Sequence, residues 1–310
     1  MASAVVFAYH NVGVRCLAVL LAHGVDVLRV ITHKDNPDEE IWFDSVAELA
    51  ARYDIPVSLP EDANDPALVA ELAALKPDFL FSFYYRQMLK NPLLALPRQG
   101  AYNMHGSLLP KYRGRVPVNW AIIHGERETG ATLHQMLEKP DAGGIVAQQA
   151  VPILPDDTAG EVFNKVTLAA ELVLDRVLPD LIKGRITPQA QNLAAGSYFG
   201  RRCAEDGRID WRRPAWAVHN LIRAVAPPYP GAFFDTSQGR LRVLRSLHPS
   251  GERGPYGQPT LFSRDSRWYA ECGDGQVLRL LAVEFAGSSL SVATGNPLPG
   301  IFGTSTLCLT

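Results

Sequence analysis

The chain has 310 residues, of which 47% are hydrophobic and 20% charged, a composition ordinary for a globular protein. That length is enough for two domains with a sizeable core. The net charge is −2 and no strong basic run occurs, which disfavours a dedicated nucleic-acid partner. The N-terminus enters an apolar run without a basic leader, and no stretch reaches the roughly 18 apolar residues of a membrane span. We therefore expect a cytoplasmic protein with no membrane segment.

The four cysteines are far apart and form no CxxC pair. They are Cys16, Cys203, Cys272 and Cys308. No histidine cluster lies near them at zinc-finger spacing. We expect reduced, mostly buried thiols and no metal site.

The N-terminal half alternates strand and helix patterns. Residues 4–9 form an apolar run typical of a parallel strand that is covered on both faces. A helical pattern then closes at Gly24, and residues 25–32 predict the second strand. The turn over residues 10–13 lacks the GxGxxG fingerprint, so it gives no support for a dinucleotide site.

The same alternation continues to residue 184. Thr158 and Glu161 have the spacing of a capping box and open a long amphipathic helix that should stop near Gly184. The loop over 137–144 joins two strands in a hairpin-like element and points Asp141 toward the carboxyl edge of the sheet. This order predicts an α/β fold with a Rossmann-like, doubly wound and mainly parallel sheet. The other expected elements are helices over 45–53, 65–75, 87–90 and 117–125, and strands over 79–83, 100–105, 129–136 and 145–151.

From about residue 207 the pattern changes to short strands with turn signals. Hairpin-like turns occur at Gln238-Gly239 and Asp274-Gly275. We expect a second, smaller C-terminal domain of β-barrel-like, OB type. The expected domains are a catalytic domain over 1–200 and a barrel-like domain over 201–310. The stretch from about 287 to 310 is weakly patterned, and no strand is assigned to it. Elsewhere the strand-like runs are 231–234, 241–244, 268–270 and 277–281.

Polar residues end the strand over residues 100–105. Asn103 and His105 are two positions apart on an extended segment, so both side chains face the same side. In open α/β sheets, ligands bind at the carboxyl ends of strands. A histidine moves protons near pH 7, a carboxylate such as Asp141 can orient it, and an asparagine amide donates to a developing oxyanion. Spacing alone favours the simpler interpretation of turn and surface residues. Arg113 and Arg115 are either surface charges or a clamp for an anion.

Six motifs follow one another in order from residue 105. They are His105-Gly106-Ser107-Leu108-Leu109-Pro110, Arg113-Gly114, Pro117, Gly125, Thr129-Gly130 and Asp141-Ala142-Gly143. This set resembles the signature of the formyltransferases that use 10-formyltetrahydrofolate. That family has a Rossmann-like domain and a smaller barrel-like C-terminal domain, in agreement with the patterns above. The resemblance covers nearly the whole chain.

The resemblance implies a role for each matching position. His105 is the expected general acid/base, Asn103 the transition-state stabiliser and Asp141 the residue that tunes His105. The implied co-substrate is 10-formyltetrahydrofolate, with no metal. The expected folate contacts, many of them through backbone groups, are Gln87, Met88, Leu89, Arg115, Leu137, Glu138, Lys139, Pro140 and Asp141.

Longer stretches narrow the resemblance to the formyltransferases of polymyxin resistance and lipid A modification. They imply a nucleotide-sugar partner, with transfer to the 4-amino group of UDP-4-amino-4-deoxy-L-arabinose. Arg201 and Arg202 are candidates for its diphosphate, because paired guanidinium groups suit that group, or else a solvated linker pair. The dehydrogenase domain that follows the formyltransferase in that group has no counterpart here, so we expect a free-standing enzyme or a fragment. The matching stretches are 5–10, 81–86, 105–115, 199–202, 222–225 and 229–233.

Four other functions stay open. Methionyl-tRNA formyltransferase shares the catalytic motif, but a polyanionic acceptor needs basic residues, and the loop Asp35–Glu40 is short and acidic. Another nucleotide-amino-sugar formyltransferase would have the same catalytic residues and a different sugar pocket. A formyltetrahydrofolate hydrolase needs only water as acceptor, and a binding module on the same fold needs no catalysis. The sequence leaves the oligomeric state open.

Overall fold

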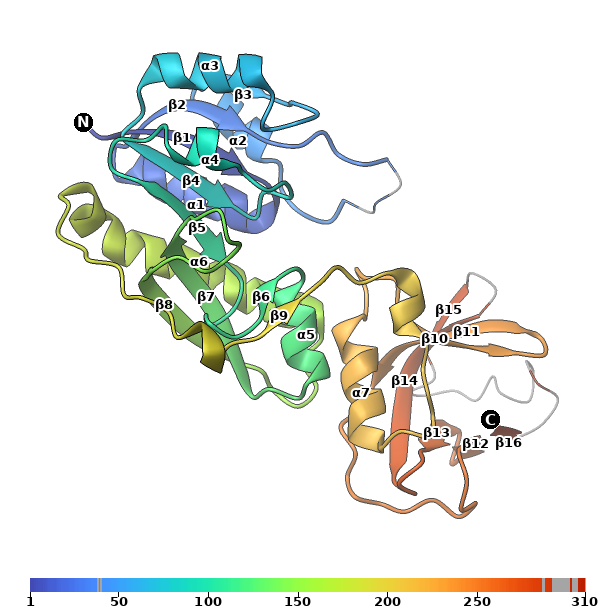
Figure 1. The fold of residues 1–310 in the computed structure, drawn as a ribbon. Helices are drawn as coiled ribbons and strands as arrows, with labels where there is room; N and C mark the ends of the chain where they lie inside the picture. Colours follow the sequence, from blue (N-terminus) through green and yellow to red (C-terminus); the bar gives the residue numbers. More distant parts are fainter. Residues whose placement is uncertain (38, 40, 286–287, 292–301, 303–305, 310) are drawn as a thin grey trace. The chain divides into compact units, whose positions relative to one another are not determined.

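The computed structural model describes residues 1–37, 39, 41–285, 288–291, 302 and 306–309 (Figure 1). The chain divides into two compact units, each with its own seven-stranded sheet. The first unit contains residues 1–117, 128–151 and 164–200. The second contains residues 118–127, 152–163 and 201–310.

The first unit is built on a sheet with strand order β3-β2-β1-β4-β5-β7-β8. The strands from β3 to β5 in this order pair in parallel, and β7 pairs antiparallel to β5. This is the predicted mainly parallel, doubly wound sheet, with its switch point between β1 and β4. The strands are β1 (Ser3–Ala8), β2 (Asp26–Ile31), β3 (Val57–Ser58), β4 (Phe79–Phe83), β5 (Ala101–His105), β7 (Glu128–Gln135) and β8 (Ile145–Pro152).

Helices and two further short strands complete the chain as far as residue 199, and residues 118–123 of α5 and 159–163 of α6 belong to the second unit. The helix α1 lies beside α6, to which it is joined by the ion pair Arg15–Glu171 (Figure 1). Among the described residues, no helix combines the length and the apolar character needed to cross a membrane. The elements are α1 (His10–Ala22), α2 (Val46–Ala51), α3 (Pro66–Leu75), α4 (Asn91–Leu94), β6 (Arg113–Gly114), α5 (Pro117–Ile123), α6 (Ala159–Ile182), η1 (Leu193–Ala195) and β9 (Tyr198–Phe199).

The local sequence explains most of these helix and strand boundaries, but one predicted helix in this part of the chain was wrong. Thr158 and Glu161 form the predicted capping box, in which each side chain accepts a hydrogen bond from the backbone N–H of the other residue. The helix predicted over residues 87–90 was wrong, because those residues are not helical and α4 begins at Asn91. The side chain of Gln87 is hydrogen-bonded to the backbone of residues 61 and 63, which ties its non-helical segment to that distant loop. Pro92 then favours a helix start one turn later.

The second unit is a curled antiparallel sheet, a half-barrel. Its strand order is β10-β11-β14-β13-β12-β16, with β15 beside β14. Trp268 is fully buried at the centre of its core, against which Val218 and Ile222 of α7 pack. The elements are η2 (Ala204–Gly207), α7 (Ala215–Ala224), β10 (Ala232–Thr236), β11 (Gly239–Ser246), β12 (Thr260–Arg264), β13 (Arg267–Glu271), β14 (Val277–Phe285), β15 (Ser288–Ser291) and β16 (Thr306–Cys308).

Two sequence predictions fall partly on positions that are not described. The acidic loop Asp35–Glu40 includes Asp38 and Glu40, which lie outside the described residues. The weakly patterned stretch from 287 to 310 is described only at 288–291, 302 and 306–309. It nevertheless contributes the edge strands β15 and β16.

Candidate active site

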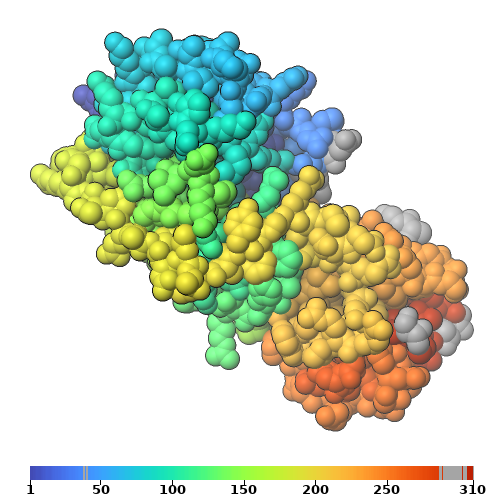
Figure 2. All heavy atoms as spheres, viewed as in Figure 1, coloured from blue at the N-terminus to red at the C-terminus, as the bar shows by residue number. Residues whose placement is uncertain are grey.

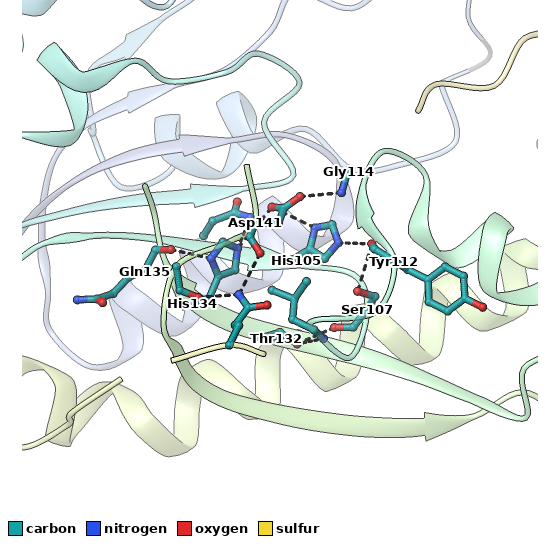
Figure 3. Close-up of polar contacts among 12 residues, drawn as sticks. His105, Ser107, Tyr112, Gly114, Thr132, His134, Gln135 and Asp141 are labelled. Atoms are coloured by element: carbon teal, nitrogen blue, oxygen red, sulfur yellow. Dashed lines mark hydrogen bonds and ion pairs between the residues drawn. The ribbon is translucent and has the colours of Figure 1, made fainter. Parts of the chain in front are cut away.

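Two neighbouring strands carry the polar groups of the site (Figure 3). β5 ends in Asn103 and His105, and β7 places His134 opposite Asn103 and Thr132 opposite His105. His105 and His134 are buried, whereas Asn103 is half-buried. Cross-strand partners lie on the same face of a sheet, so all four side chains project to one side.

Both ring nitrogens of His105 face a partner. Nε2 lies 2.8 Å from the backbone carbonyl oxygen of Tyr112, and Nδ1 lies 3.6 Å from Oδ1 of Asp141. A carbonyl oxygen only accepts hydrogen bonds, so Nε2 carries the hydrogen. The separation from Asp141 is too long for a hydrogen bond but suits an ion pair when the ring is protonated. Nδ1 is therefore the nitrogen that can exchange a proton with a reactant.

Asp141 is held in place through its side chain and its backbone. Oδ2 accepts a hydrogen bond of 2.8 Å from the backbone N–H of Gly114, and the Asp141 carbonyl accepts one of 2.9 Å from Gln191. Burial raises the pKa of the Asp141 carboxyl, but the interactions with His105, with His134 and with the Gly114 N–H outweigh burial. Together they hold that pKa well below its ordinary range. The carboxylate is therefore ionised throughout the neutral pH range.

His134 belongs to the site, although the sequence motifs did not single it out. Its Nδ1 lies 2.7 Å from the carbonyl oxygen of Gln135, and its Nε2 lies 3.1 Å from the amide nitrogen of Asn103. The same Nε2 lies 3.5 Å from Oδ1 of Asp141. A histidine within an apolar strand pattern gives no functional signal by itself. Only the register between β5 and β7 brings it next to Asn103.

Hydrogen bonds from β7 and β8 fix the loop that follows β5. The hydroxyl of Thr132 donates to the carbonyl of Ser107 at 2.6 Å and accepts from the N–H of Leu109 at 3.2 Å. Gln148 donates to the Leu109 carbonyl and to the Thr132 hydroxyl, each at 2.9 Å. The Ser107 hydroxyl donates to the carbonyl of Lys111 at 2.7 Å. These hydrogen bonds fix the loop that contains Tyr112, whose carbonyl oxygen accepts from Nε2 of His105.

The ribbon formed by β6 and β9 supports the same loop from its other end. The backbone N–H of Tyr112 donates to the hydroxyl of Ser197 at 2.9 Å. A Cβ at Gly114 would lie 2.2 Å from the carbonyl oxygen of Phe199, so only glycine fits the position whose N–H binds Asp141. In Figure 2 the yellow surface formed by residues near 195 lies against the green surface of the segments that follow β5.

The residues predicted to contact folate differ in what they offer. Met88 and Leu137 are apolar residues that are 54% and 53% exposed. The side-chain amide of Gln87 is already bonded at both ends, and Leu89 is buried, so both offer only backbone groups. Arg115 is exposed, and its guanidinium has no partner among the residues that the structure describes.

The remaining predicted folate contacts lead directly into Asp141. Glu138 and Lys139 are exposed, and their charged groups have no partner within the described parts of the chain. Pro140 is half-buried. This short segment therefore ends in the Asp141 carboxylate and exposes two charged side chains, Glu138 and Lys139, beside it.

The predicted diphosphate pair belongs to the second unit, where its two members differ. The guanidinium of Arg202 lies 4.8 Å from the centre of the Trp120 ring and donates to the carbonyl of Asp206 at 2.7 Å. Arg201 is exposed and has no partner among the described residues. No group of three or more His, Cys, Asp or Glu side chains in the described ranges is arranged to hold a metal ion.

Known proteins share this architecture. An N-formyltransferase from Helicobacter canadensis, in complex with folinic acid and dTDP-3-aminofucose, matches with a TM-score of 0.73 at 23% identity, over 90% of this chain and 99% of that chain. WlaRD, a sugar 3N-formyltransferase whose structure was determined in the presence of dTDP and 5-N-formyl-THF, matches with a TM-score of 0.72 at 21% identity, over 90% of this chain and 97% of that chain. HypX from Aquifex aeolicus, in complex with tetrahydrofolic acid, matches with a TM-score of 0.62 at 20% identity, over 94% of this chain and 46% of that chain.

Two family models also match the sequence. The formyl transferase model matches residues 15–178, and the model of the formyl transferase C-terminal domain matches residues 203–294. The first match alone spans more than half of the chain, and it contains Asn103, His105 and Asp141. The protein therefore belongs to the formyl transferase family.

Proposed function

We propose that this formyltransferase moves the formyl group of 10-formyltetrahydrofolate to an amino group of a nucleotide-linked sugar. The observation that carries the proposal is the convergence of Asn103, His105 and Asp141 on one side of the carboxyl end of β5. These residues supply an amide donor, a proton carrier and a carboxylate within one rigid frame. Formyl-folate binding by sugar N-formyltransferases of the same fold supports the choice of donor.

The predicted folate contacts fit such a ligand. Met88 and Leu137 present exposed apolar surface, which suits the flat pterin and aminobenzoyl rings of a folate. Arg115 presents an exposed guanidinium that pairs with none of the described residues, and such a group suits a glutamate carboxylate. The backbone groups of Gln87 and Leu89 stay available for the polar edge of the pterin. When bound, the folate supplies the formyl group and a nitrogen that leaves.

Bond formation begins when the acceptor amine attacks the formyl carbon. The carbonyl electrons move onto the formyl oxygen, which becomes negative. An N–H of Asn103 stabilises that charge, and one such donor is worth on the order of 3–4 kcal/mol. Nδ1 of His105 takes the proton that the attacking nitrogen must lose. The imidazolium so formed faces Asp141 at ion-pair distance.

Bond breaking then returns the proton. The negative oxygen re-forms its double bond to carbon, and the bond between the formyl carbon and the folate nitrogen breaks. Nδ1 of His105 donates its proton to that departing nitrogen, so His105 ends in its starting state. Throughout, Nε2–H stays on the Tyr112 carbonyl, which keeps the ring in one orientation. Asp141 supplies negative charge, and it gains no proton because its pKa is low.

The proposed acceptor is the 4-amino group of UDP-4-amino-4-deoxy-L-arabinose. Its support is the resemblance of stretches such as 81–86 and 199–202 to the formyltransferase domain of the polymyxin-resistance protein ArnA. The acidic residues Asp35 and Glu39 in the loop after β2 argue against tRNA, whose phosphates require cations. A dTDP-linked amino sugar is the second candidate, favoured by the ligands of the H. canadensis enzyme and WlaRD.

A comparison of acceptors tests this proposal. The purified protein receives 10-formyltetrahydrofolate with UDP-4-amino-4-deoxy-L-arabinose, a dTDP-3-amino sugar, methionyl-tRNA or no acceptor. The formylated product is detected by mass spectrometry and tetrahydrofolate by absorbance. We expect rapid formylation of the UDP sugar and slow release of formate without acceptor. Formylation of tRNA alone would refute the nucleotide-sugar proposal, and preference for the dTDP sugar would replace the UDP assignment.

A further inference from the structure

His134 makes contacts that the mechanism above leaves unused. Its side chain is 2% exposed and lies directly across from Asn103 in the antiparallel register of β5 and β7. Its Nδ1 lies 2.7 Å from the Gln135 carbonyl oxygen, and its Nε2 lies 3.1 Å from the amide nitrogen of Asn103. Figure 3 shows the ring with Gln135 at one nitrogen and Asp141 on the side of the other.

The Gln135 carbonyl decides which nitrogen of His134 carries the hydrogen. A carbonyl oxygen accepts but does not donate, so Nδ1 is the N–H donor. In the neutral ring Nε2 then has a lone pair and acts as an acceptor. Only the NH₂ group of Asn103 satisfies that acceptor. The alternative amide orientation would turn an oxygen toward Nε2 and leave buried lone pairs unsatisfied.

The tautomer of His134 therefore determines the orientation of the Asn103 amide. One N–H of Asn103 is bound by His134, and the second N–H remains for the formyl oxygen. We propose that His134 is a positioning residue that holds the Asn103 amide in its oxyanion-stabilising orientation. This inference rests on the proposed formyl transfer, because formyl transfer is the reaction in which the second N–H would bind the developing oxyanion.

Asp141 lies on the same side of the His134 ring. Its Oδ1 lies 3.5 Å from Nε2, farther than the Asn103 amide nitrogen at 3.1 Å. In the neutral ring with hydrogen on Nδ1, a reversed amide would turn a further acceptor toward Nε2 in a buried environment, where unpaired polar groups are costly.

A double-mutant cycle separates positioning from packing. His134→Met keeps an apolar side chain of similar length but removes the acceptor, whereas His134→Gln returns an acceptor oxygen near the position of Nε2. Each is made alone and with Asn103→Ala, and kcat and KM are measured for both substrates. His23→Met, an exposed histidine at the end of α1, is the matched control.

We expect His134→Met to lower kcat by about 10- to 100-fold, with little change in the KM for folate. His134→Gln should stay within about fivefold of the wild type, because its oxygen can accept from Asn103. In the Asn103→Ala background, His134→Met should cost less than about threefold, since no amide remains to be positioned. Losses that simply multiply in the double variant would overturn the proposal and leave His134 a packing residue.

Nuclear magnetic resonance of ¹⁵N-histidine-labelled protein gives a readout that needs no turnover. The His134 ring, assigned by comparison with His134→Gln, should show hydrogen on Nδ1 and a free Nε2 in its neutral form. The Asn103 side-chain amide signals should shift in His134→Met. Hydrogen on Nε2 would overturn the proposal even in an inactive protein. The expected tautomer in a protein that formylates no acceptor would instead refute the proposed function and leave the amide orientation standing.

Discussion

Nε2 of His105 donates its hydrogen to the carbonyl of Tyr112 at 2.8 Å, so a loop carbonyl fixes the orientation of the imidazole. In the Ser-His-Asp arrangement the carboxylate holds one ring nitrogen, and the reacting group meets the other. Here Asp141 lies on the Nδ1 side of the ring, the side to which the proposed mechanism also assigns the reactants. Asp141 therefore acts on the charge of the imidazole rather than on its orientation.

Removing the charge of Asp141 tests whether this carboxylate acts on the charge of the His105 imidazole. Asp141→Asn keeps the size of the side chain and an oxygen for the Gly114 N–H, but it leaves the imidazolium of His105 without a counter-charge. We expect kcat to fall by roughly 10²-fold or more, as it should for His105→Ala. The KM for folate should change little. Steady-state kinetics give both values.

Glu128→Gln is the matched control for that substitution, because it neutralises an exposed carboxylate on β7. It should leave kcat near the wild-type value. Near-normal turnover of Asp141→Asn would show that the carboxylate does not support the proton transfer. A large change in the KM for folate alone would assign Asp141 to binding.

Gly106 provides a test of the rigid loop. A Cβ at this position would lie 1.8 Å from the hydroxyl oxygen of Tyr84, which is far too close. Gly106→Ala should therefore lower the free energy of unfolding by about 1–3 kcal/mol and reduce turnover. Tyr84→Phe removes the obstructing oxygen, so the double variant Gly106→Ala/Tyr84→Phe should recover much of both losses. Equal losses with and without Tyr84→Phe would mean that the contact is not the cause.

Arg115 is the clearest test of the folate site. Arg115→Ala removes an exposed guanidinium without a partner among the described residues, so its effect on folding should be small. If it pairs with a folate carboxylate, the KM for folate should rise about tenfold with kcat nearly unchanged. Calorimetric titration with 5-formyltetrahydrofolate should show the same loss. Arg127→Ala, also exposed, should change neither value, and an unchanged affinity in Arg115→Ala would exclude the predicted contact.

The sequence predicted those features that depend on short-range pattern. The apolar runs of β1 and β4 are buried on both faces, so period and composition were sufficient to place them. Thr158 and Glu161 lie within one turn, so their capping box could be read directly. The family resemblance assigned Asn103, His105 and Asp141 to one site, and the structure brings them to one edge of the sheet.

Features that depend on tertiary contacts escaped prediction. His134 joins the site through strand register, and register is not encoded in any local motif. The helix α7 was missed because its buried polar residues, His219 and Arg223 among them, interrupt the apolar periodicity. The role of Gln87 as a bridge to residues 61–63 also depends on a contact between distant segments.

The buried histidine of α7 predicts how stability depends on pH. His219 accepts from Ser246 and donates to the carbonyl of Pro155, and burial lowers its pKa to about 4 from an ordinary 6.5. Between these values the unfolded chain binds a proton that the folded protein does not. The contribution of neutral His219 to the free energy of unfolding should therefore be fully present above pH 6.5, and it should decrease as the pH falls toward 4. At pH 5 the loss from this one residue should be about 2 kcal/mol.

Denaturant unfolding at pH 7 and pH 5 measures this effect. Four of the five tryptophans lie in the second unit, so their fluorescence reports mainly on the unit that contains His219. His219→Gln can keep both hydrogen bonds but cannot take up the proton. It should be somewhat less stable than the wild type at pH 7, and the difference should shrink by about 2 kcal/mol at pH 5. A constant difference between His219→Gln and the wild type at the two pH values would show that His219 does not destabilise the fold in acid.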